Sequence, residues 1–180
     1  MEDLPEDISE IKRMNKPIVG YYGAIATWLN YDLINKLTLQ RPDYNFVFIG
    51  SDFKGLSLIQ KRKNVFYLGE KRYKDLYMYS KQFSCAIIPF KEGEIATATS
   101  PVKLFEYMAV GKQVVCTKDL LECAGYDGVY LAQNDEDFLS LVDRAIQLSG
   151  DEALKQKLIR SAYNNTWQQH ANDICNSLLK

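Results

Sequence analysis

TSPVKLFEYMAVG, residues 99–111, is the stretch around which the rest of the chain is organised, and it predicts a short helix. Ser100 is a favoured N-cap residue. Pro101 suits the first helical position, because the amide hydrogen that it lacks would have no partner there. Gly111 can adopt the left-handed conformation that commonly ends a helix. Both ends of the helix are therefore marked in the sequence.

The predicted helix is apolar on most sides and carries only two charged residues, Lys103 and Glu106. Because they are three positions apart, they lie on one face of the helix. One interpretation is an ion pair on the exposed strip of the helix. The other is a ligand that lies across the helix N-terminus, with phosphates near Lys103 and hydroxyls on Glu106. The stretch by itself favours the ion pair.

Six short runs of apolar residues predict β-strands that are buried on both faces. Strands of this kind that alternate with helices are typical of a parallel sheet covered on both sides. We therefore expect an α/β fold, a doubly wound parallel sheet of about six strands flanked by helices. The expected strands are IVGYY (18–22), NFVFIG (45–50), NVFYLG (64–69), SCAIIPF (84–90), QVVCT (113–117) and GVYLA (128–132).

Helical patterns fall between and after these strands. Apolar residues recur at helical spacing over residues 28–39, with Asn30 or Asp32 near the start. YKDLYMYSKQ, residues 73–82, predicts another helix, and residues 135–180 are helical in pattern. The chain is thus expected to end in helices.

The first 16 residues differ from the rest of the chain. Residues 1–16 are acidic and polar, and Ile8 and Ile11 are their main apolar pair. We interpret this segment as a leader or interdomain linker rather than as a core element, and residues 17–180 as one domain.

The charge of the chain excludes some partners. The formal net charge is −1, so there is no global electrostatic case for binding nucleic acid or an anionic membrane. Residues 54–74 are locally basic, with seven Lys or Arg residues and one acidic residue. A solvated surface is the usual meaning of such a run; the alternative is a docking patch for a phospholipid face or an acidic partner.

The cysteines indicate a protein of a reducing compartment, and the cysteines and the histidine together argue against a metal site in it. Cys85, Cys116, Cys123 and Cys175 have no CxxC spacing, which favours free thiols, and His170 has no second histidine near it. No apolar run approaches the roughly 20 residues of a membrane span, and the N-terminus lacks the pattern of a signal peptide. We expect a cytoplasmic protein without metal or cofactor.

The expected topology brings two loops together. If the strands follow the order 3-2-1-4-5-6, the first and fourth are neighbours, and ligands of such folds bind at the carboxyl ends of these two strands. The loops that follow them, residues 20–25 and 91–103, then face each other, which shifts the interpretation of Lys103 and Glu106 toward ligand binding. The absence of a side chain at Gly23 would let a diphosphate approach the backbone, although glycines in such places are more often simple turn residues.

Neither of two common phosphate-binding motifs is present. There is no GxGxxG after the first strand, which weakens a dehydrogenase assignment, and no GxxxxGK[ST] loop.

Five motifs, taken in order, carry a resemblance to a known family. The chain resembles the C-terminal, nucleotide-sugar-binding half of retaining glycosyltransferases with two Rossmann-like domains, the GT-B type of the glycosyl transferases group 1 family. The resemblance covers about residues 16–117. The motifs are VGYYGAIATWLNYDLI (19–34), NFVFIG (45–50), NVFYLG (64–69), CAIIPF (85–90) and SPVKLFEYMAVGKQVV (100–115).

The resemblance implies a role for several residues. The donor would be a nucleoside-diphosphate sugar of the UDP or GDP type, bound without a metal. Glu106 matches the family glutamate that holds the ribose hydroxyls, and a carboxylate can accept hydrogen bonds from two adjacent hydroxyls. The residues implied in donor binding are Gly23 and Ala24 near the diphosphate, Leu68 and Gly69 near the base, and Ser100, Pro101, Val102 and Lys103 around the phosphates.

The chain departs from the family pattern at two places. The family signature has a second glutamate eight positions before Glu106, where this chain has Ala98; the nearest upstream carboxylates are Glu94 and Glu92. Many relatives also carry an Arg and a Lys after the first strand, whereas YYGAIATWLN has no basic residue. Lys103, helped by Lys91, then supplies the positive charge near the diphosphate.

The resemblance also implies what this chain lacks. In family members the N-terminal domain binds the acceptor and carries catalytic groups. The isolated chain is therefore expected to be catalytically inactive. The leading hypothesis is the donor-binding domain of a hexosyltransferase of polysaccharide biosynthesis, acting on a glycan or lipid-linked acceptor, in the cytoplasm or at the inner face of the membrane. The alternatives are a non-catalytic interaction module with a degenerate donor site, and another nucleotide-sugar enzyme such as an epimerase.

Overall fold

A parallel β-sheet forms the centre of the molecule. The structure, a computed structural model, describes residues 4–93, 96 and 102–166. All six strand expectations are confirmed, with ends that differ by a few residues. The strands are β1 (Ile18–Tyr22), β2 (Asn45–Ile49), β3 (Val65–Tyr67), β4 (Cys85–Ile88), β5 (Val114–Thr117) and β6 (Val129–Ala132).

The strand order is β3-β2-β1-β4-β5-β6, and every pair is parallel. The doubly wound order assumed from the sequence is therefore confirmed. Every residue of β1, β2, β4 and β5 is buried, whereas β3 and β6 are partly exposed at the two edges. This difference explains why the central strands are apolar throughout, since helices cover both of their faces.

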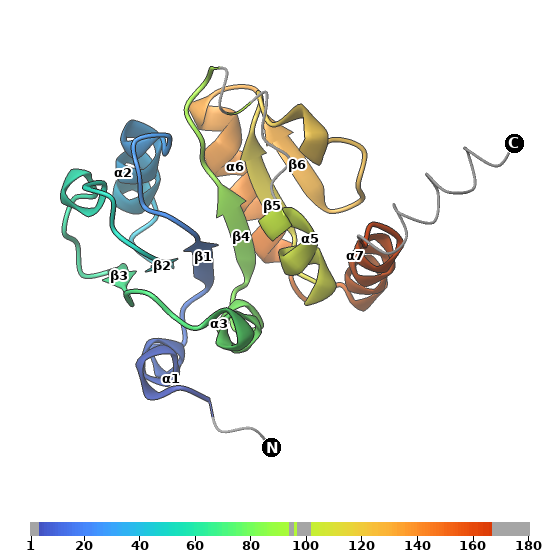
Figure 1. The fold of residues 1–180 in the computed structure, drawn as a ribbon, viewed down its shortest axis with the longest axis horizontal. Helices are drawn as coiled ribbons and strands as arrows, with labels where there is room; N and C mark the ends of the chain where they lie inside the picture. The colour runs from blue at the N-terminus through green and yellow to red at the C-terminus, as the bar shows by residue number, and fades with distance from the viewer. Residues whose placement is uncertain (1–3, 94–95, 97–101, 167–180) are drawn as a thin grey trace, which may run out of the picture.

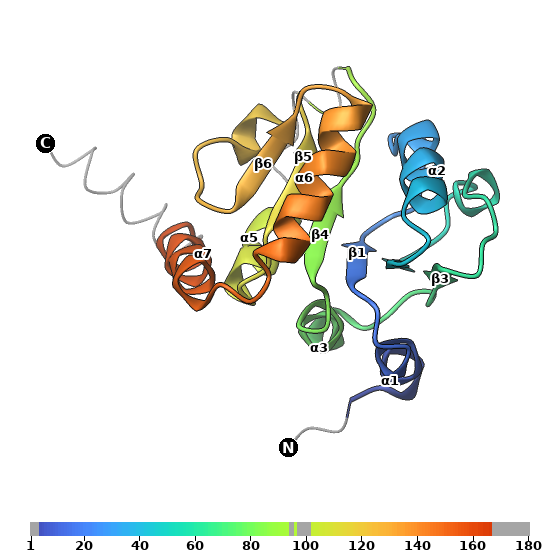
Figure 2. The same cartoon turned by 180° about the vertical axis from the view of Figure 1, so that it is seen from behind.

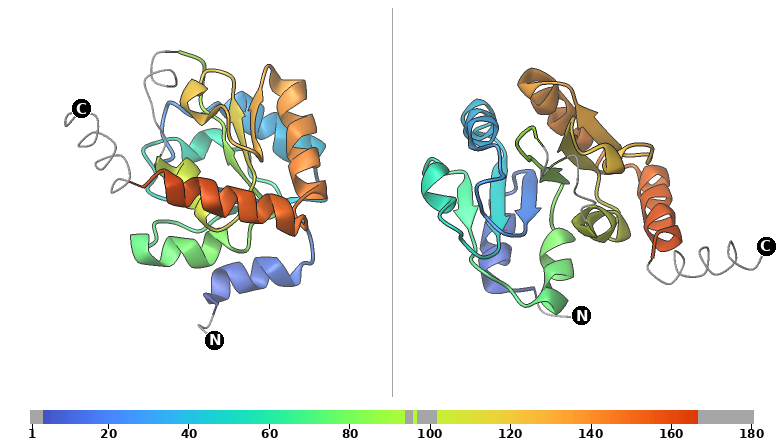
Figure 3. Two further views of the ribbon diagram at one scale, coloured as in Figure 1. Left: turned by 90° about the vertical axis from the view of Figure 1, so that its right-hand side faces the viewer. Right: turned by 45° about the horizontal axis from the view of Figure 1, so that its top comes forward.

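Helices cover the two faces of the sheet as the topology requires. α2 and α6 lie on one face of the sheet and α3 and α5 on the other, as the tilted view shows (Figure 3, right; Figure 2 shows α6 and α2 in front). α7 packs along α5 (Figure 1). The helices are α1 (Glu6–Arg13), α2 (Tyr31–Gln40), α3 (Leu76–Ser80), α5 (Val102–Ala109), α6 (Asp135–Gln147) and α7 (Glu152–Asn164), with the 3₁₀ turns η1 (Leu56–Leu58), η2 (Tyr73–Asp75) and η3 (Leu121–Cys123).

One predicted helix begins at its predicted start, and another is shorter than the sequence pattern predicts. α2 starts at Tyr31, because the Asn30 side chain accepts a hydrogen bond from the Leu33 amide at 3.0 Å and so caps it there. The segment 73–82 is a 3₁₀ turn followed by a helix of only five residues. Within the described part of the chain, no helix has both the length and the apolar character that crossing a bilayer requires.

The N-terminal segment is a core element, which corrects the sequence interpretation. α1 buries Ile8 and Ile11 completely or nearly so, at 0% and 3% exposure, and both belong to the same core as the strands. Its polar face is also tied to the domain: Asp7 pairs with Lys71 at 2.8 Å, and Lys12 donates to Gln82 at 2.9 Å. Two apolar residues three apart are enough to anchor a short amphipathic helix. That the segment leads from another domain stays a prediction.

The C-terminal end of α5 is as predicted. Gly111 has a φ of +71°, and its amide donates to the Met108 carbonyl at 2.8 Å. The next amide, that of Lys112, returns to the Tyr107 carbonyl at 3.0 Å. This is the left-handed stop that only glycine adopts without strain. The predicted cap and first residue, Ser100 and Pro101, lie outside the described residues, as does Ala98.

Candidate functional site

The loops after β1 and β4 meet at the carboxyl edge of the sheet. The Lys91 amide donates to the Trp28 carbonyl at 2.7 Å, and the Asn30 amide donates to the Pro89 carbonyl at 2.8 Å. The pairing of β1 with β4 brings these loops together. The two loops therefore meet where the strand order predicts, and the first turn of α5 lies beside the loop after β1.

Gly23 and Lys103, two residues implied in diphosphate binding, are in contact. Gly23 follows β1 with a φ of +136°, and a Cβ added to it would lie 2.6 Å from the Lys103 Nζ and 3.1 Å from the Tyr21 Oη. The Gly23 amide donates to the Ile49 carbonyl at 2.9 Å, which fixes the backbone there. The glycine is needed both for its backbone conformation and for the space that the lysine occupies.

Lys103 lies among aromatic rings rather than beside a carboxylate. Its Nζ donates to the Tyr21 Oη at 3.2 Å and stands 4.7 Å and 5.2 Å from the ring centroids of Tyr21 and Phe90. Burial lowers the pKa of the ammonium to about 8, although the charge of Glu106 opposes this shift. A buried ammonium held by cation–π contacts is partly compensated and gains from an anionic ligand.

The ion-pair interpretation of Lys103 and Glu106 is wrong. None of the ion pairs between described residues includes either side chain. The Glu106 carboxylate instead accepts hydrogen bonds from two tyrosine hydroxyls, Tyr22 at 2.8 Å to Oε2 and Tyr73 to Oε1. Lys103 points to the end of β1, while Glu106, one turn later, faces the segment that precedes α3.

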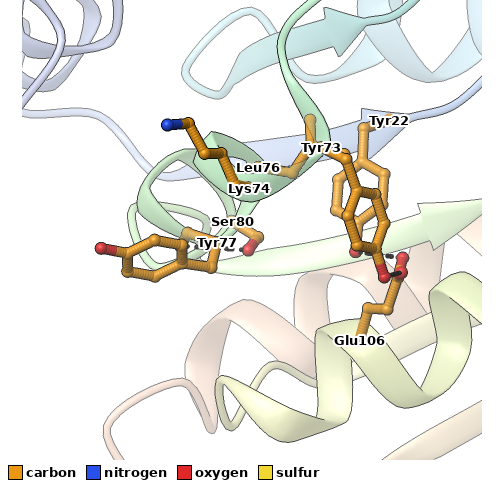
Figure 4. Close-up of a pocket in the computed structure, with 7 residues that line it drawn as sticks. All are labelled: Tyr22, Tyr73, Lys74, Leu76, Tyr77, Ser80 and Glu106. Atoms are coloured by element: carbon orange, nitrogen blue, oxygen red, sulfur yellow. Dashed lines mark hydrogen bonds between the residues drawn. The ribbon is translucent and has the colours of Figure 1, made fainter.

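A cavity of about 220 Å³ opens beside Glu106, between α5 and the η2–α3 segment (Figure 4). A carboxylate, three phenol rings and a hydroxyl line it, a mixture that suits a ligand with both hydroxyls and an apolar surface. The lining residues are Tyr22, Tyr73, Lys74, Leu76, Tyr77, Ser80 and Glu106.

Tyr107 holds β1 against α5, and the sequence interpretation did not include it. Its ring is fully buried, 4.5 Å from the Tyr22 ring between centroids, and its Oη accepts a hydrogen bond from the Tyr22 amide at 2.8 Å. The position directly after Glu106 on a buried helix was a signal that could have identified it. Tyr73 had no comparable signal, since it lies 33 residues from the glutamate that it contacts.

The predicted base-side residues also lie at the carboxyl edge. The Gly69 carbonyl accepts from the Gly50 amide at 2.9 Å, and the Leu68 amide donates to the Phe48 carbonyl at 3.0 Å. A Cβ on Gly69 would meet no atom within 4 Å, so packing does not require a glycine at this position. The φ of +69° at Gly69, which favours glycine, does. The Gly50 Cα in turn stands against Gly23, because a Cβ there would lie 2.1 Å from the Gly23 carbonyl oxygen.

The remaining predicted residues fall in several places. The Ala24 carbonyl accepts from the Tyr21 hydroxyl at 3.1 Å, and Val102, the first residue of α5, is half exposed. Lys91 stands over the Tyr31 ring at 6.0 Å, and Glu92 pairs with Lys118 at 2.7 Å. Glu94 lies outside the described residues.

The described residues contain no group of three or more His, Cys, Asp or Glu side chains that could hold a metal ion. Donor binding without a metal stays a prediction.

Comparison with known proteins gives a family match over most of the chain. The model of the family described as "Glycosyl transferases group 1" matches residues 16–151. The curated protein "Putative teichuronic acid biosynthesis glycosyltransferase TuaH" of Bacillus subtilis (strain 168) is 27% identical over 159 residues, which are 83% of this chain and 40% of TuaH.

Solved structures share the fold. Anabaena Alr3699/HepE, in complex with UDP and glucose, has a TM-score of 0.66 at 17% identity, over 96% of this chain and 53% of that one. A mutant of S. aureus TarM, in complex with Fondaparinux, alpha-GlcNAc-glycerol and UDP, has a TM-score of 0.63 at 16% identity, over 91% of this chain and 35% of that one. The chain therefore spans about half or less of the length of these proteins.

Proposed function

The chain belongs to the glycosyl transferases group 1 family, and on that premise we propose that it is the donor-binding part of a glycosyltransferase. The protein would move a hexose-type sugar from a nucleoside-diphosphate sugar to a glycan or lipid-linked acceptor in polysaccharide biosynthesis. The observation that carries this proposal is the contact of Lys103 with Gly23, with Glu106 one helical turn further on.

The diphosphate would lie against Gly23 and Lys103. The missing side chain of Gly23 leaves room at the backbone once Lys103 turns toward the phosphates, and the first amides of α5 favour an anion at the same place. Negative charge grows on the diphosphate as the bond to the sugar breaks. The Lys103 ammonium, which lies 3.2 Å from the Tyr21 hydroxyl in the free chain, would stabilise that charge from its position against the phosphates.

The ribose would lie against Glu106. Its carboxylate already accepts two hydroxyl hydrogen bonds, so its present partners have the chemistry of a sugar diol. Leu68 and Gly69 then place backbone groups on the base side, and the cavity beside Glu106 leaves room for the nucleoside. HepE and TarM, which share the fold, were each solved with UDP, which supports a UDP-type donor.

The acceptor and the catalytic groups would come from a further domain. TuaH is longer than this chain, which covers 40% of it. We therefore propose that the isolated 180-residue chain binds a donor but does not transfer the sugar.

Calorimetric titration of the 180-residue chain with UDP, GDP and their sugars tests the proposal. Binding of at least one nucleotide is expected, and failure to bind any of them at millimolar concentration would contradict the function. Glu106→Ala should weaken nucleotide binding about tenfold or more, because it removes hydrogen bonds to a charged acceptor. Glu152→Ala, on α7 and outside the cavity lining, is the matched control and should bind as the wild type does.

One sequence feature favours a second candidate, a non-catalytic module that keeps the fold. Ala98 replaces the family's first glutamate, which would remove a contact on the sugar side. Such a module would capture a partner through residues 54–74, and added nucleotide would not change the capture. The calorimetric result separates the two functions, since a module with a degenerate site binds no donor.

A further inference from the structure

We infer that Tyr73 is a positioning residue of the donor site, whose hydroxyl competes with the donor's ribose for Glu106. The Tyr73 Oη donates to Glu106 Oε1, the group to which a ribose hydroxyl would donate. Tyr73 and Glu106 line the same cavity, so a ribose hydroxyl that reaches Oε1 from this cavity meets the Tyr73 hydroxyl there and must displace it. The inference rests on the proposed function and adds to it a residue that sets how tightly the nucleoside binds.

The two tyrosines on Glu106 differ in how firmly they are held. Tyr22 is 5% exposed, its ring packs on Tyr107 at 4.5 Å between centroids, and its amide donates to the Tyr107 hydroxyl. Tyr73 is 74% exposed, although it contributes to the same cavity wall. Tyr22 is therefore a permanent partner of Oε2, whereas the bond from Tyr73 to Oε1 is exchangeable.

The backbone around Tyr73 is anchored on both sides. Lys71 pairs with Asp7 of α1 at 2.8 Å, and Arg72 pairs with Asp75 at 2.6 Å across the 3₁₀ turn. Leu76, the first residue of α3, packs against the core. Release of Glu106 therefore needs rotation of one exposed side chain and not opening of the segment. Figure 4 shows the Tyr73 ring standing over the carboxylate from this turn.

The contact affects only ligands that carry a ribose. A nucleoside diphosphate must exchange one hydroxyl partner of Glu106 for another, so part of its hydrogen-bond energy is offset by the lost tyrosine contact. Inorganic pyrophosphate has no ribose hydroxyl that could donate a hydrogen bond to Glu106. It would therefore reach Lys103 and Gly23 without displacing Tyr73. Removal of the Tyr73 hydroxyl should thus strengthen binding of the first ligand and not of the second.

The test is calorimetric titration of wild-type chain, Tyr73→Phe and Tyr163→Phe with UDP, GDP and pyrophosphate. Tyr163, on α7, is 75% exposed, which matches Tyr73, and it lies outside the site. Tyr73→Phe should bind the preferred nucleotide about three- to tenfold more tightly, because a hydrogen bond to a charged acceptor no longer opposes it. Its pyrophosphate affinity, and both affinities of Tyr163→Phe, should equal those of the wild type.

Each other outcome overturns the inference. Equal or weaker nucleotide binding by Tyr73→Phe, in a chain whose wild type binds nucleotide, shows that Tyr73 does not compete, and the proposed function stands. An equal gain for nucleotide and pyrophosphate shows that the effect does not pass through the ribose. If the wild type binds no nucleotide, the proposed function fails and this inference fails with it.

Discussion

Gly23 and Lys103 are in close contact: the lysine Nζ lies 2.6 Å from the position that a Cβ at residue 23 would take. The two residues are 80 positions apart in the chain and meet because β1 and β4 are neighbours. The glycine therefore controls where the site's positive charge stands.

Gly23→Ala is expected to abolish most nucleotide binding while it costs only moderate stability. The new methyl group displaces the flexible end of Lys103, and the φ of +136° adds strain of about 1–3 kcal/mol. Gly93→Ala is the matched control for stability, because Gly93 has a φ of +134° with no atom within 4 Å of its missing Cβ. Urea unfolding should give similar losses for both variants. A much larger loss for Gly23→Ala would mean that Lys103 cannot move aside.

Nucleotide affinity is expected to fall as the pH rises above 8. The pKa of Lys103 is about 8 because of burial, so the free chain loses this ammonium above that pH, while an anionic ligand restores it. Binding at higher pH must then include uptake of a proton, and the affinity should fall about tenfold per pH unit until the pKa of the complex is reached. The phosphates of the ligand are fully ionised over this range, since their last pKa is about 6.

Calorimetry between pH 7 and 9.5, in buffers of different ionisation enthalpy, measures both the affinity and the proton uptake. Lys103→Met should bind weakly at every pH, without the decline. Lys112→Met is the matched control, because burial also lowers the pKa of Lys112 to about 8, but this residue lies beyond the opposite end of α5. A pH decline that Lys112→Met removes and Lys103→Met keeps would contradict the assignment.

The fold was predictable from the sequence because its information is local. Each central strand is a continuous apolar run, and runs such as residues 45–49 and 85–88 are buried at every position. The covering helices then limit the order of a doubly wound sheet to few choices. α1 was misjudged because only two of its residues, Ile8 and Ile11, face the core, and the acidic residues around them dominated the pattern.

The site was predictable only in part, because its contacts are long-range. The first turn of α5 identified Lys103 and Glu106, but helical spacing suggested that they bind each other. The partners that they have instead, Tyr21, Tyr22 and Tyr73, lie 82, 84 and 33 residues away along the chain. A tyrosine at a strand end is indistinguishable in sequence from an ordinary core residue until the strand order places it.

Tyr107→Phe is expected to destabilise the domain by about 1–3 kcal/mol, because the Tyr22 amide would lose its acceptor inside the core. The ring and its packing remain, so the loss reports the hydrogen bond and not a cavity. Tyr163→Phe, which changes an exposed tyrosine, should alter the free energy of unfolding by less than about 0.5 kcal/mol. Equal stabilities of the two variants in urea unfolding would mean that the Tyr22 amide finds another partner.

Ile8→Ala is expected to cost about 2–5 kcal/mol of unfolding free energy, the range for removing a buried isoleucine. Ile8 is 0% exposed and lies in the common core, so its removal leaves a cavity between α1 and the sheet. Arg13→Ala, at the end of the same helix and exposed, should change stability little. A leader that does not belong to the domain would give two equally small effects. A large loss for Ile8→Ala alone would instead mean that α1 folds as part of the domain.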